Sequence, residues 1–225
     1  ALGIGAGDEI LVPTWTFAAT AQVVEWLGAV PVLCDVEPDT LNLDAAKAEE
    51  KISKKTRGMI PVHMGGYPCD LDGIDRLAKS FDLKVVEDAA HAIGTRYKGR
   101  KIGNFSHVTC FSFYATKNLT MGEGGAAVSR DPGLIEKIAQ LAYFGINKDA
   151  HRRYKKEGTW FYDIEYTGYK CNLDSIHAAI GISQLEKLDV MNSRRRQIAA
   201  LYRENLSSSL TFTRDSDPDH FHTYH

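Results

Sequence analysis

Short apolar runs alternate with helix-length amphipathic stretches along most of this sequence. The apolar runs predict strands at residues 9–12, 30–36, 58–62, 83–88, 108–113 and 124–129. The amphipathic stretches predict helices at residues 17–27, 43–53, 71–81, 132–144 and 172–188. Because strands that alternate with helices form βαβ units, the expected fold class is α/β, with a mostly parallel sheet covered by helices on both faces.

Two segments depart from this rhythm. Residues 147–169 are polar, basic and aromatic with little periodicity, and we expect a long excursion there rather than core. Residues 192–206 predict a charged helix that carries the run Arg194-Arg195-Arg196. Such a run is most simply a solvated helix face, and contact with an anion or with another subunit is the alternative.

Composition argues against several classes of function. The 225 residues carry a formal net charge of −2, which is not the electrostatic footprint of a nucleic-acid-binding protein. No apolar run is long enough to span a membrane, and the first residues lack the features of a signal peptide. The four cysteines show no metal-binding spacing. The sequence therefore favours a reduced, cytoplasmic protein with no nucleic-acid, membrane or metal partner.

The strand predicted at residues 83–88 ends in the acid pair Glu87-Asp88, and His91 follows three residues later. In α/β sheets of this kind ligands bind at the carboxyl ends of the strands, so we expect Asp88 to face a ligand crevice. The alternatives for a single Asp at such a position are a helix N-cap and a buried carboxylate whose hydrogen bonds are satisfied.

A lysine follows the strand predicted at residues 108–113 and precedes a Gly-rich turn. Lys117 is poorly placed there for a solvated surface role, and partial burial would lower its pKa and make its amine a nucleophile for a Schiff base. Ser112, at the end of the same strand, has a hydroxyl able to donate to a phosphate. Taken singly, each residue has a plainer interpretation, as a snorkelling surface lysine and an ordinary strand serine.

One cofactor needs these groups together. Pyridoxal 5'-phosphate (PLP) requires a lysine for its Schiff base, an acid that keeps the ring nitrogen protonated, and donors for its phosphate. Asp88, Ser112 and Lys117 offer them on adjacent sheet elements, with Lys117 29 residues after Asp88. The sequence therefore predicts a PLP site.

An ordered set of motifs resembles a known family. The motifs are EDAAH at 87–91, FSF at 111–113, KNL at 117–119, EGG at 123–125 and GYKCNL at 168–173. They resemble the DegT-type (DegT/DnrJ) nucleotide-sugar aminotransferases, which are fold-type I PLP enzymes, over essentially the whole chain. The resemblance implies a fragment: residues 1–189 would be the large PLP-binding domain without its N-terminal part, and residues 190–225 the truncated start of a smaller C-terminal domain.

The resemblance also implies roles for individual residues. Lys117 would be the Schiff-base lysine, and Asp88 would be the partner of the pyridine nitrogen. His91 would lie near the 3-oxygen of the cofactor ring, Ser112 would bind the phosphate, and Phe17 would stack on the ring. Without the resemblance, Phe17 would be interpreted as a core residue of the first helix.

The GYKCNL loop is implied to act across a subunit interface. Members of the family commonly carry an Asn at the position of Lys170, and that Asn reaches the phosphate of the partner subunit. Lys170 or the nearby Asn172 is expected to take this role here. The resemblance therefore implies a homodimer with shared active sites.

The activity implied is transfer of an amino group from an amino acid, L-glutamate, to a UDP- or dTDP-linked 4-keto sugar in amino-sugar and polysaccharide biosynthesis. Two alternatives stay open. A sugar dehydratase on the same fold carries histidine in place of the lysine, so Lys117 argues against it. A PLP-binding regulator without turnover would be favoured by loss of Lys117 or Asp88, and both are present.

Overall fold

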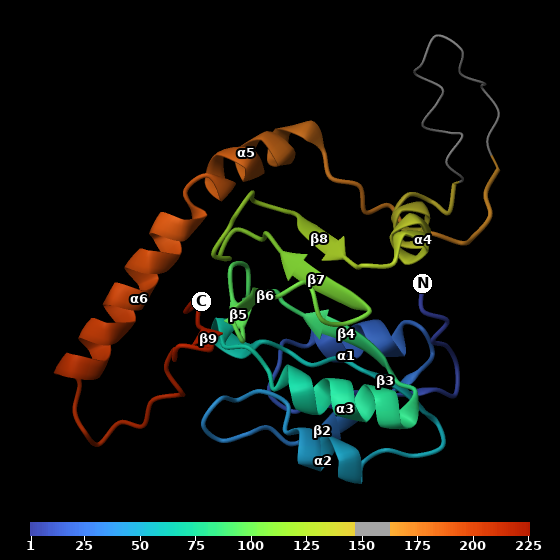
Figure 1. Cartoon of the computed structure of the whole chain (residues 1–225). Coiled ribbons are helices and arrows are strands. Elements are labelled where there is room, and N and C mark those ends of the chain that lie inside the picture. The colour runs from blue at the N-terminus through green and yellow to red at the C-terminus, as the bar shows by residue number, and fades with distance from the viewer. Residues whose placement is uncertain (147–162) are drawn as a thin grey trace.

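Six strands form the main sheet of the computed structural model, in the order β2-β1-β3-β4-β7-β8 (Figure 1). In chain order they are β1 (Glu9–Pro13), β2 (Val30–Cys34), β3 (Thr56–Met59), β4 (Lys84–Asp88), β7 (Val108–Ser112) and β8 (Gly125–Val128). Neighbours run parallel except β8, which is antiparallel to β7. The six predicted strands and the mostly parallel sheet are confirmed. The structure describes residues 1–146 and 163–225, so most of the excursion predicted at 147–169 lies outside the described residues.

The helices of the described ranges connect or follow these strands. They are α1 (Ala19–Glu25), α2 (Ala45–Glu50), the 3-10 helix η1 (Met64–Gly66), α3 (Leu71–Phe81), α4 (Pro132–Ala142), α5 (Ser175–Leu185) and α6 (Leu188–Asn205). Asp44, Asp70 and Asp131 cap α2, α3 and α4 by accepting backbone N–H bonds from the first turn. Such caps satisfy donors that a helix start leaves unpaired, which is why the starts of α3 and α4 match the sequence prediction.

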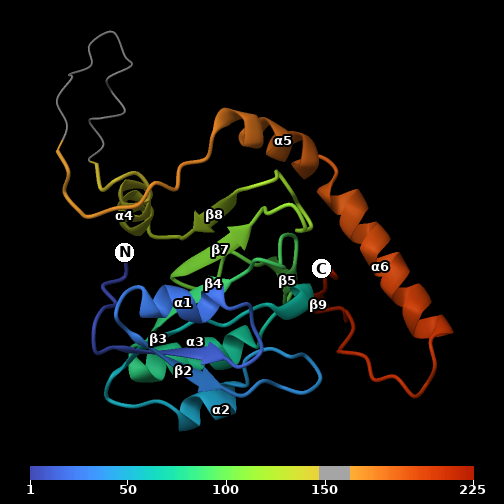
Figure 2. The same cartoon turned by 180° about the vertical axis from the view of Figure 1, so that it is seen from behind.

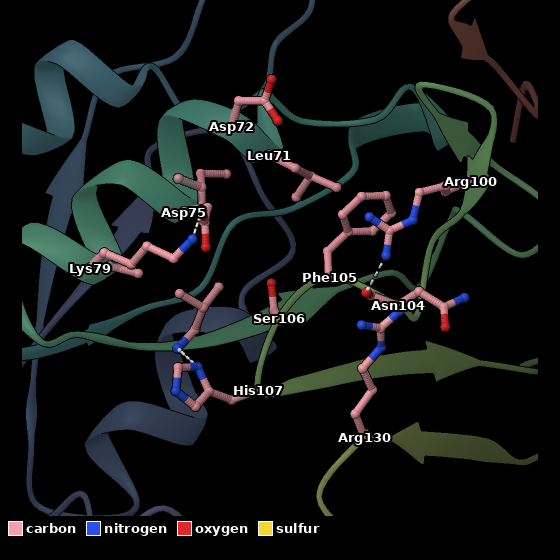
Figure 3. Close-up of a pocket in the computed structure, with 13 residues that line it drawn as sticks. Leu71, Asp72, Asp75, Lys79, Arg100, Asn104, Phe105, Ser106, His107 and Arg130 are labelled. Atoms are coloured by element: carbon pink, nitrogen blue, oxygen red, sulfur yellow. Dashed lines mark hydrogen bonds and ion pairs between the residues drawn. The ribbon is translucent and has the colours of Figure 1, made fainter.

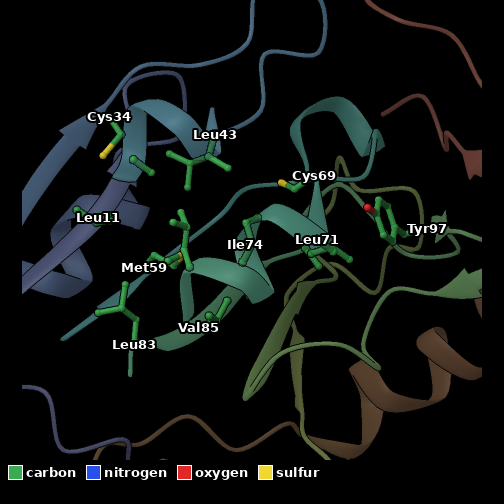
Figure 4. Close-up of a cluster of buried hydrophobic side chains, with 14 of the residues drawn as sticks. Leu11, Cys34, Leu43, Met59, Cys69, Leu71, Ile74, Leu83, Val85 and Tyr97 are labelled. Atoms are coloured by element: carbon green, nitrogen blue, oxygen red, sulfur yellow. The ribbon is translucent and has the colours of Figure 1, made fainter. Parts of the chain in front are cut away.

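Helices cover both faces of the sheet, as predicted. Alternate residues of β1 point to opposite faces. Leu11 packs in the cluster that includes Ile74 of α3, whereas Ile10 and Val12 pack with Val24 of α1. The α3 side holds the larger cluster, shown in Figure 4. Accordingly, α3 lies in front of the sheet and α1 behind it in Figure 1, and Figure 2 shows them in the reverse order.

A small antiparallel sheet ties the end of the chain to the main body. Its strands are β5 (Arg96–Tyr97), β6 (Arg100–Lys101) and β9 (His220–Phe221), in the order β6-β5-β9. Helix α6 runs away from the main sheet, and the chain then returns so that its end lies beside β5 (Figure 1). His222 and Thr223 are buried. Residues 220–225 therefore pack on the main body, and the domain division at residue 190 stays a prediction.

The described residues also bear on the expectations for cysteines, membrane spans and metal sites. All four cysteines are free, Cys34 and Cys69 in the core and Cys110 and Cys171 exposed. None of the helices within 1–146 and 163–225 is long and apolar enough to cross a membrane. Within the same ranges, no group of three or more His, Cys, Asp or Glu side chains is placed to hold a metal ion.

Candidate active site

A cavity of about 550 Å³ lies where β4 and β7 end. Parallel strands bring their carboxyl ends to one edge of the sheet, so the turns that follow β4 and β7 meet there. The cavity is lined by five of the seven predicted site residues, Phe17, Asp88, His91, Ser112 and Lys117, together with neighbours from the same turns. Its volume is that of a small-molecule site.

Asp88 is the last residue of β4, and two donors hold its carboxylate. The hydroxyl of Thr20 in α1 donates to Oδ2 at 2.9 Å, and the backbone N–H of Ala90 donates to Oδ1 at 3.1 Å. The hydroxyl of Thr16 lies 2.7 Å from that of Thr20 and is the donor in this pair, because Thr20 gives its proton to Asp88. No helix starts at the turn after Asp88, so the interpretation as an N-cap is wrong.

Lys117 stands in the turn that follows β7, where its backbone N–H donates to Tyr114 O at 2.9 Å. Burial lowers the pKa of its amine below the ordinary lysine value, and the nearby charge of Asp88 opposes part of this shift. The expected lowering of the pKa of Lys117 by partial burial is therefore confirmed in direction. Lys117 and Asp88 face the same cavity, and the role of Lys117 as a Schiff-base lysine stays a prediction.

His91 lies in the turn after β4 and faces the cavity as a neutral ring. Burial, and to a smaller extent the charge of Lys117, lowers its pKa to about 4. Its Nδ1 accepts a hydrogen bond from the backbone N–H of Gly65 at 3.3 Å. The proton of the neutral ring is therefore on Nε2.

Ser112 and Phe17 supply a hydroxyl and an aromatic face to the cavity. Ser112 Oγ accepts the backbone N–H of Tyr114 at 3.3 Å, which leaves its own proton free to donate. Phe17 precedes α1 instead of lying within it, and it is 77% exposed. The interpretation of Phe17 as a core residue is therefore wrong, and its ring is accessible to a ligand.

Lys170 and Asn172 lie outside this cavity. Both are exposed, and Lys170 donates to Asn172 Oδ1. The ammonium group of Lys170 also lies 5.6 Å from the centre of the Tyr143 ring. Within one subunit, these two residues therefore lie apart from the five predicted site residues that line the cavity. Their role toward a partner subunit stays a prediction.

Glu87, the other acid of the pair, points to the opposite side of β4 and is fully buried. Its carboxylate lies 2.8 Å from His63 Nε2 and also accepts from Thr109 Oγ1 at 2.9 Å and from the N–H of Ser106 at 3.1 Å. The N–H of Cys69 donates to His63 Nδ1 at 3.0 Å, so Nε2 carries the proton that His63 gives to Glu87. This network, which the sequence analysis missed, anchors the end of β4 behind the site.

A second polar cavity, of about 460 Å³, lies at the opposite ends of β4 and β7, beside α3. Figure 3 shows its lining, in which Lys79 and Asp75 form an ion pair of 2.6 Å and Arg100 donates to Asn104 O at 3.1 Å. None of the predicted site residues lines it. We therefore place the candidate active site in the first cavity.

Comparison with known proteins identifies the family of the chain. A model of the DegT/DnrJ/EryC1/StrS aminotransferase family matches residues 1–225. The chain belongs to this family. The resemblance carried by the EDAAH, FSF, KNL, EGG and GYKCNL motifs is confirmed.

Two curated members of the family are similar over most of the chain. The chain is 46% identical over 202 residues to the spore coat polysaccharide biosynthesis protein SpsC of Bacillus subtilis, covering 90% of this chain and 52% of SpsC. It is 39% identical over 224 residues to the GDP-perosamine synthase of Escherichia coli O157:H7, covering 100% of this chain and 58% of the synthase. The chain thus spans about half the length of the curated relatives it matches.

A solved structure of the family has the same fold. Spr1654 of Streptococcus pneumoniae in its PMP form is 31% identical and superposes with a TM-score of 0.88, covering 99% of this chain and 61% of Spr1654. The expected fold, the large domain of a fold-type I PLP-dependent transferase, is confirmed.

Proposed function

We propose that this chain is part of a PLP-dependent aminotransferase that moves an amino group from L-glutamate to a nucleotide-linked 4-keto sugar. Membership of an aminotransferase family supports the reaction type. The names of GDP-perosamine synthase and SpsC support a nucleotide sugar and a polysaccharide product. The observation that carries the proposal is that Asp88 and Lys117 face one cavity, where the lysine has a lowered pKa.

The lining of the cavity fits PLP in charge and in hydrogen bonding. Asp88 is a carboxylate fixed in place and suited to a protonated ring nitrogen, and Ser112 has a hydroxyl proton free for a phosphate. Phe17 presents an exposed ring to a planar cofactor. The lowered pKa of Lys117 suits an amine that attaches to an aldehyde. When bound, PLP supplies an electron sink that makes loss of the proton from the substrate carbon feasible.

Lys117 is the residue to which we assign the proton transfers. Its unprotonated Nζ takes the proton from the α-carbon of L-glutamate, and in the half-reaction with the keto sugar the transfer runs in reverse and delivers a proton to the sugar carbon. A base needs a pKa near the working pH, and burial moves the pKa of Lys117 in that direction. Asp88 is held in place by hydrogen bonds from Thr20 and Ala90.

The functional unit we propose is a homodimer in which Lys170 and Asn172 of one subunit serve the active site of the other. A phosphate dianion needs several donors, and Ser112 is one. Both residues are exposed and lie outside the cavity of their own subunit. Two-fold dimers are also the commonest oligomers.

Mass spectrometry of the full-length protein tests the proposed reaction. The PLP-loaded protein is incubated with L-glutamate and UDP-, dTDP- and GDP-linked 4-keto sugars, with Lys117→Ala as the control. We expect 2-oxoglutarate and one amino sugar from the wild type and neither from the variant. Conversion of glutamate without amination of any sugar would contradict the substrate class, and no conversion of glutamate would contradict the aminotransferase activity itself.

A further inference from the structure

A buried polar network lies directly beside Lys117 and has no part in the proposed reaction steps. Its centre is Asn118, which is 2% exposed. Asn118 Nδ2 donates to Oδ1 of Asn192 in α6 at 3.1 Å and to the backbone oxygen of Thr223 at 3.0 Å. A satisfied buried polar group holds the segments that it joins in one arrangement. Asn118 therefore fixes the turn of Lys117 to α6 and to the last residues of the chain.

The hydrogen bonds of Asn192 establish which way the amide of Asn118 points. Asn192 Nδ2 donates to Ile93 O at 3.2 Å, so Asn192 Oδ1 is the acceptor that faces Asn118. Asn118 Oδ1 is then turned toward His225, whose Nδ1 lies 3.1 Å away. Because an amide oxygen only accepts hydrogen bonds, Nδ1 of His225 carries a proton.

The ring of His225 stacks on the ring of His91, with centroids 4.0 Å apart and an interplanar angle of 16°. Thr223 Oγ1 donates to the backbone oxygen of His91 at 3.1 Å, and the N–H of His225 donates to Gly65 O at 2.8 Å. Thr223 and the backbone of His91 leave no room for a Cβ at Gly66. Residues 223–225 therefore pack tightly on the turn that presents His91.

Both stacked rings are neutral. Burial lowers the pKa of His91 and of His225 to about 4, and the positive charge of Lys117 adds to the effect on each. Since Nδ1 of His91 accepts from Gly65, its remaining polar group is the Nε2–H donor. Stacking therefore brings no charge repulsion and fixes the plane in which this donor lies.

We propose that His225 and Asn118 are positioning residues of the active site, which together hold the His91 ring in the plane where its Nδ1 accepts from Gly65, so that Nε2–H is presented to the bound cofactor. The cofactor meant is PLP, so this inference rests on the proposed function. His91 lines the cavity, whereas His225 and Asn118 do not, and they act through it. Residues 223–225 thereby support the turn that presents His91 to the cavity.

The first test measures binding of PLP to the full-length protein by absorbance titration. His225→Ala removes the stacked ring and the bond to Asn118, and His225→Phe keeps a ring but removes the Nδ1 proton. His222→Phe is the matched control, because His222 belongs to the same segment but stacks on Tyr224, with centroids 3.8 Å apart. We expect the Kd of PLP to rise about tenfold in His225→Ala, by less in His225→Phe, and not in the control.

The second test observes His91 without cofactor. Nitrogen NMR of the histidine-labelled full-length protein, with His91 assigned by loss of its signals in His91→Gln, reports which ring nitrogen carries the proton. We expect the proton on Nε2 in the wild type and a mixture of both tautomers in His225→Ala. If His225→Ala does not fold, His225→Leu, which fills the same space without a stacking ring or an Nδ1 proton, provides the same comparison.

Two results overturn the positioning role. One is a His225→Ala protein with the wild-type Kd for PLP and the wild-type His91 tautomer. The other is an equal loss of PLP affinity in His222→Phe, since destabilisation of the segment alone then explains the effect. A wild type that binds PLP and forms 2-oxoglutarate keeps the proposed aminotransferase activity in either case. A wild type that does not bind PLP removes the proposed function, and the NMR comparison still decides the role of His225 toward His91.

Discussion

Thr20, in the first turn of α1, donates its hydroxyl hydrogen bond to the carboxylate of Asp88 at the end of β4, over 2.9 Å. The two residues are 68 positions apart in the sequence. The bond holds Oδ2 in place, while the N–H of Ala90 holds Oδ1. The orientation of the carboxylate in the cavity thus depends on the packing of α1 against the sheet.

Thr20→Val should lower the proposed aminotransferase activity without unfolding the protein. The change keeps the shape of the buried side chain and removes the donor to Asp88. A hydrogen bond to a charged group contributes about 1.5–3 kcal/mol, so we expect kcat/KM to fall roughly tenfold to a hundredfold. Steady-state kinetics of the full-length protein checks this, and Thr20→Ser, which keeps the hydroxyl, should stay near wild type. Equal kinetics of the valine and serine variants would show that Asp88 does not depend on this bond.

Asp88→Asn should retain the fold and lose activity. The amide is of the same size but lacks the charge proposed to hold the ring nitrogen protonated. We expect kcat to fall by about a thousandfold or more, which corresponds to about 4 kcal/mol in the barrier. The matched control is Asp75→Asn, an exposed partner of Lys79 in α3. Near-normal aminotransfer by Asp88→Asn would mean that Asp88 is a structural carboxylate.

Borohydride reduction of the PLP-loaded full-length protein should attach the cofactor to Lys117. Lys117 is the lysine that lines the cavity in the described part of the chain. Peptide mapping by mass spectrometry locates the adduct, and Lys117→Ala should show none at this position and lose both half-reactions. An adduct on a different lysine of the wild type contradicts the assignment.

Mixing two inactive variants should restore part of the activity. Lys117→Ala lacks the proposed base, and the double variant Lys170→Ala/Asn172→Ala lacks the proposed donors to the partner's phosphate. With shared sites, a mixed dimer has one site with both defects and one with neither. Activity is measured after subunit exchange, which a tagged subunit demonstrates separately. No recovery despite exchange would count against phosphate binding across the interface by this loop.

The free energy of unfolding should fall in mild acid because of His222. Burial lowers the pKa of His222 from its ordinary 6.5 to about 4, so the folded state binds fewer protons than the unfolded state between these values. Stability is therefore full above about pH 6.5 and decreases as the pH falls toward 4, by up to about 3 kcal/mol from this residue. Denaturant titrations of the full-length protein across this range check it. His222→Phe should show a shallower dependence, and an unchanged slope would contradict the prediction.

The strands of the sheet, and the site residues at their carboxyl ends, could be predicted because each is indicated by a short stretch of contiguous sequence. Each apolar run of four to seven residues is a complete strand signal, and Asp88 and Ser112 end two such runs. The position of a residue at the carboxyl end of a parallel strand then places it near the ligand. The strands β5, β6 and β9 were not predictable, because two residues carry no periodicity.

The support of the site was not predictable because it depends on contacts between distant segments. Thr20, Asn118 and His225 have ordinary polar side chains whose sequence neighbours give no sign of their partners. Asn118 meets Thr223 across 105 residues. Phe17 was misinterpreted because its sequence context carries the wrong signal. An aromatic residue near the start of a predicted helix suggests a core position, and here the side chain is exposed beside the cavity.

The return of the chain at β9 sets an order of events during synthesis. Thr223 donates a hydrogen bond to the backbone of His91 across 132 residues. The turn that carries His91 therefore lacks this contact until those residues have been synthesised. At roughly 5–20 residues per second, this interval lasts roughly 7 to 26 s on the ribosome. The parallel sheet has its strands available well before that moment. Loading of the cofactor into a finished site is then possible only after residues 223–225 have left the exit tunnel.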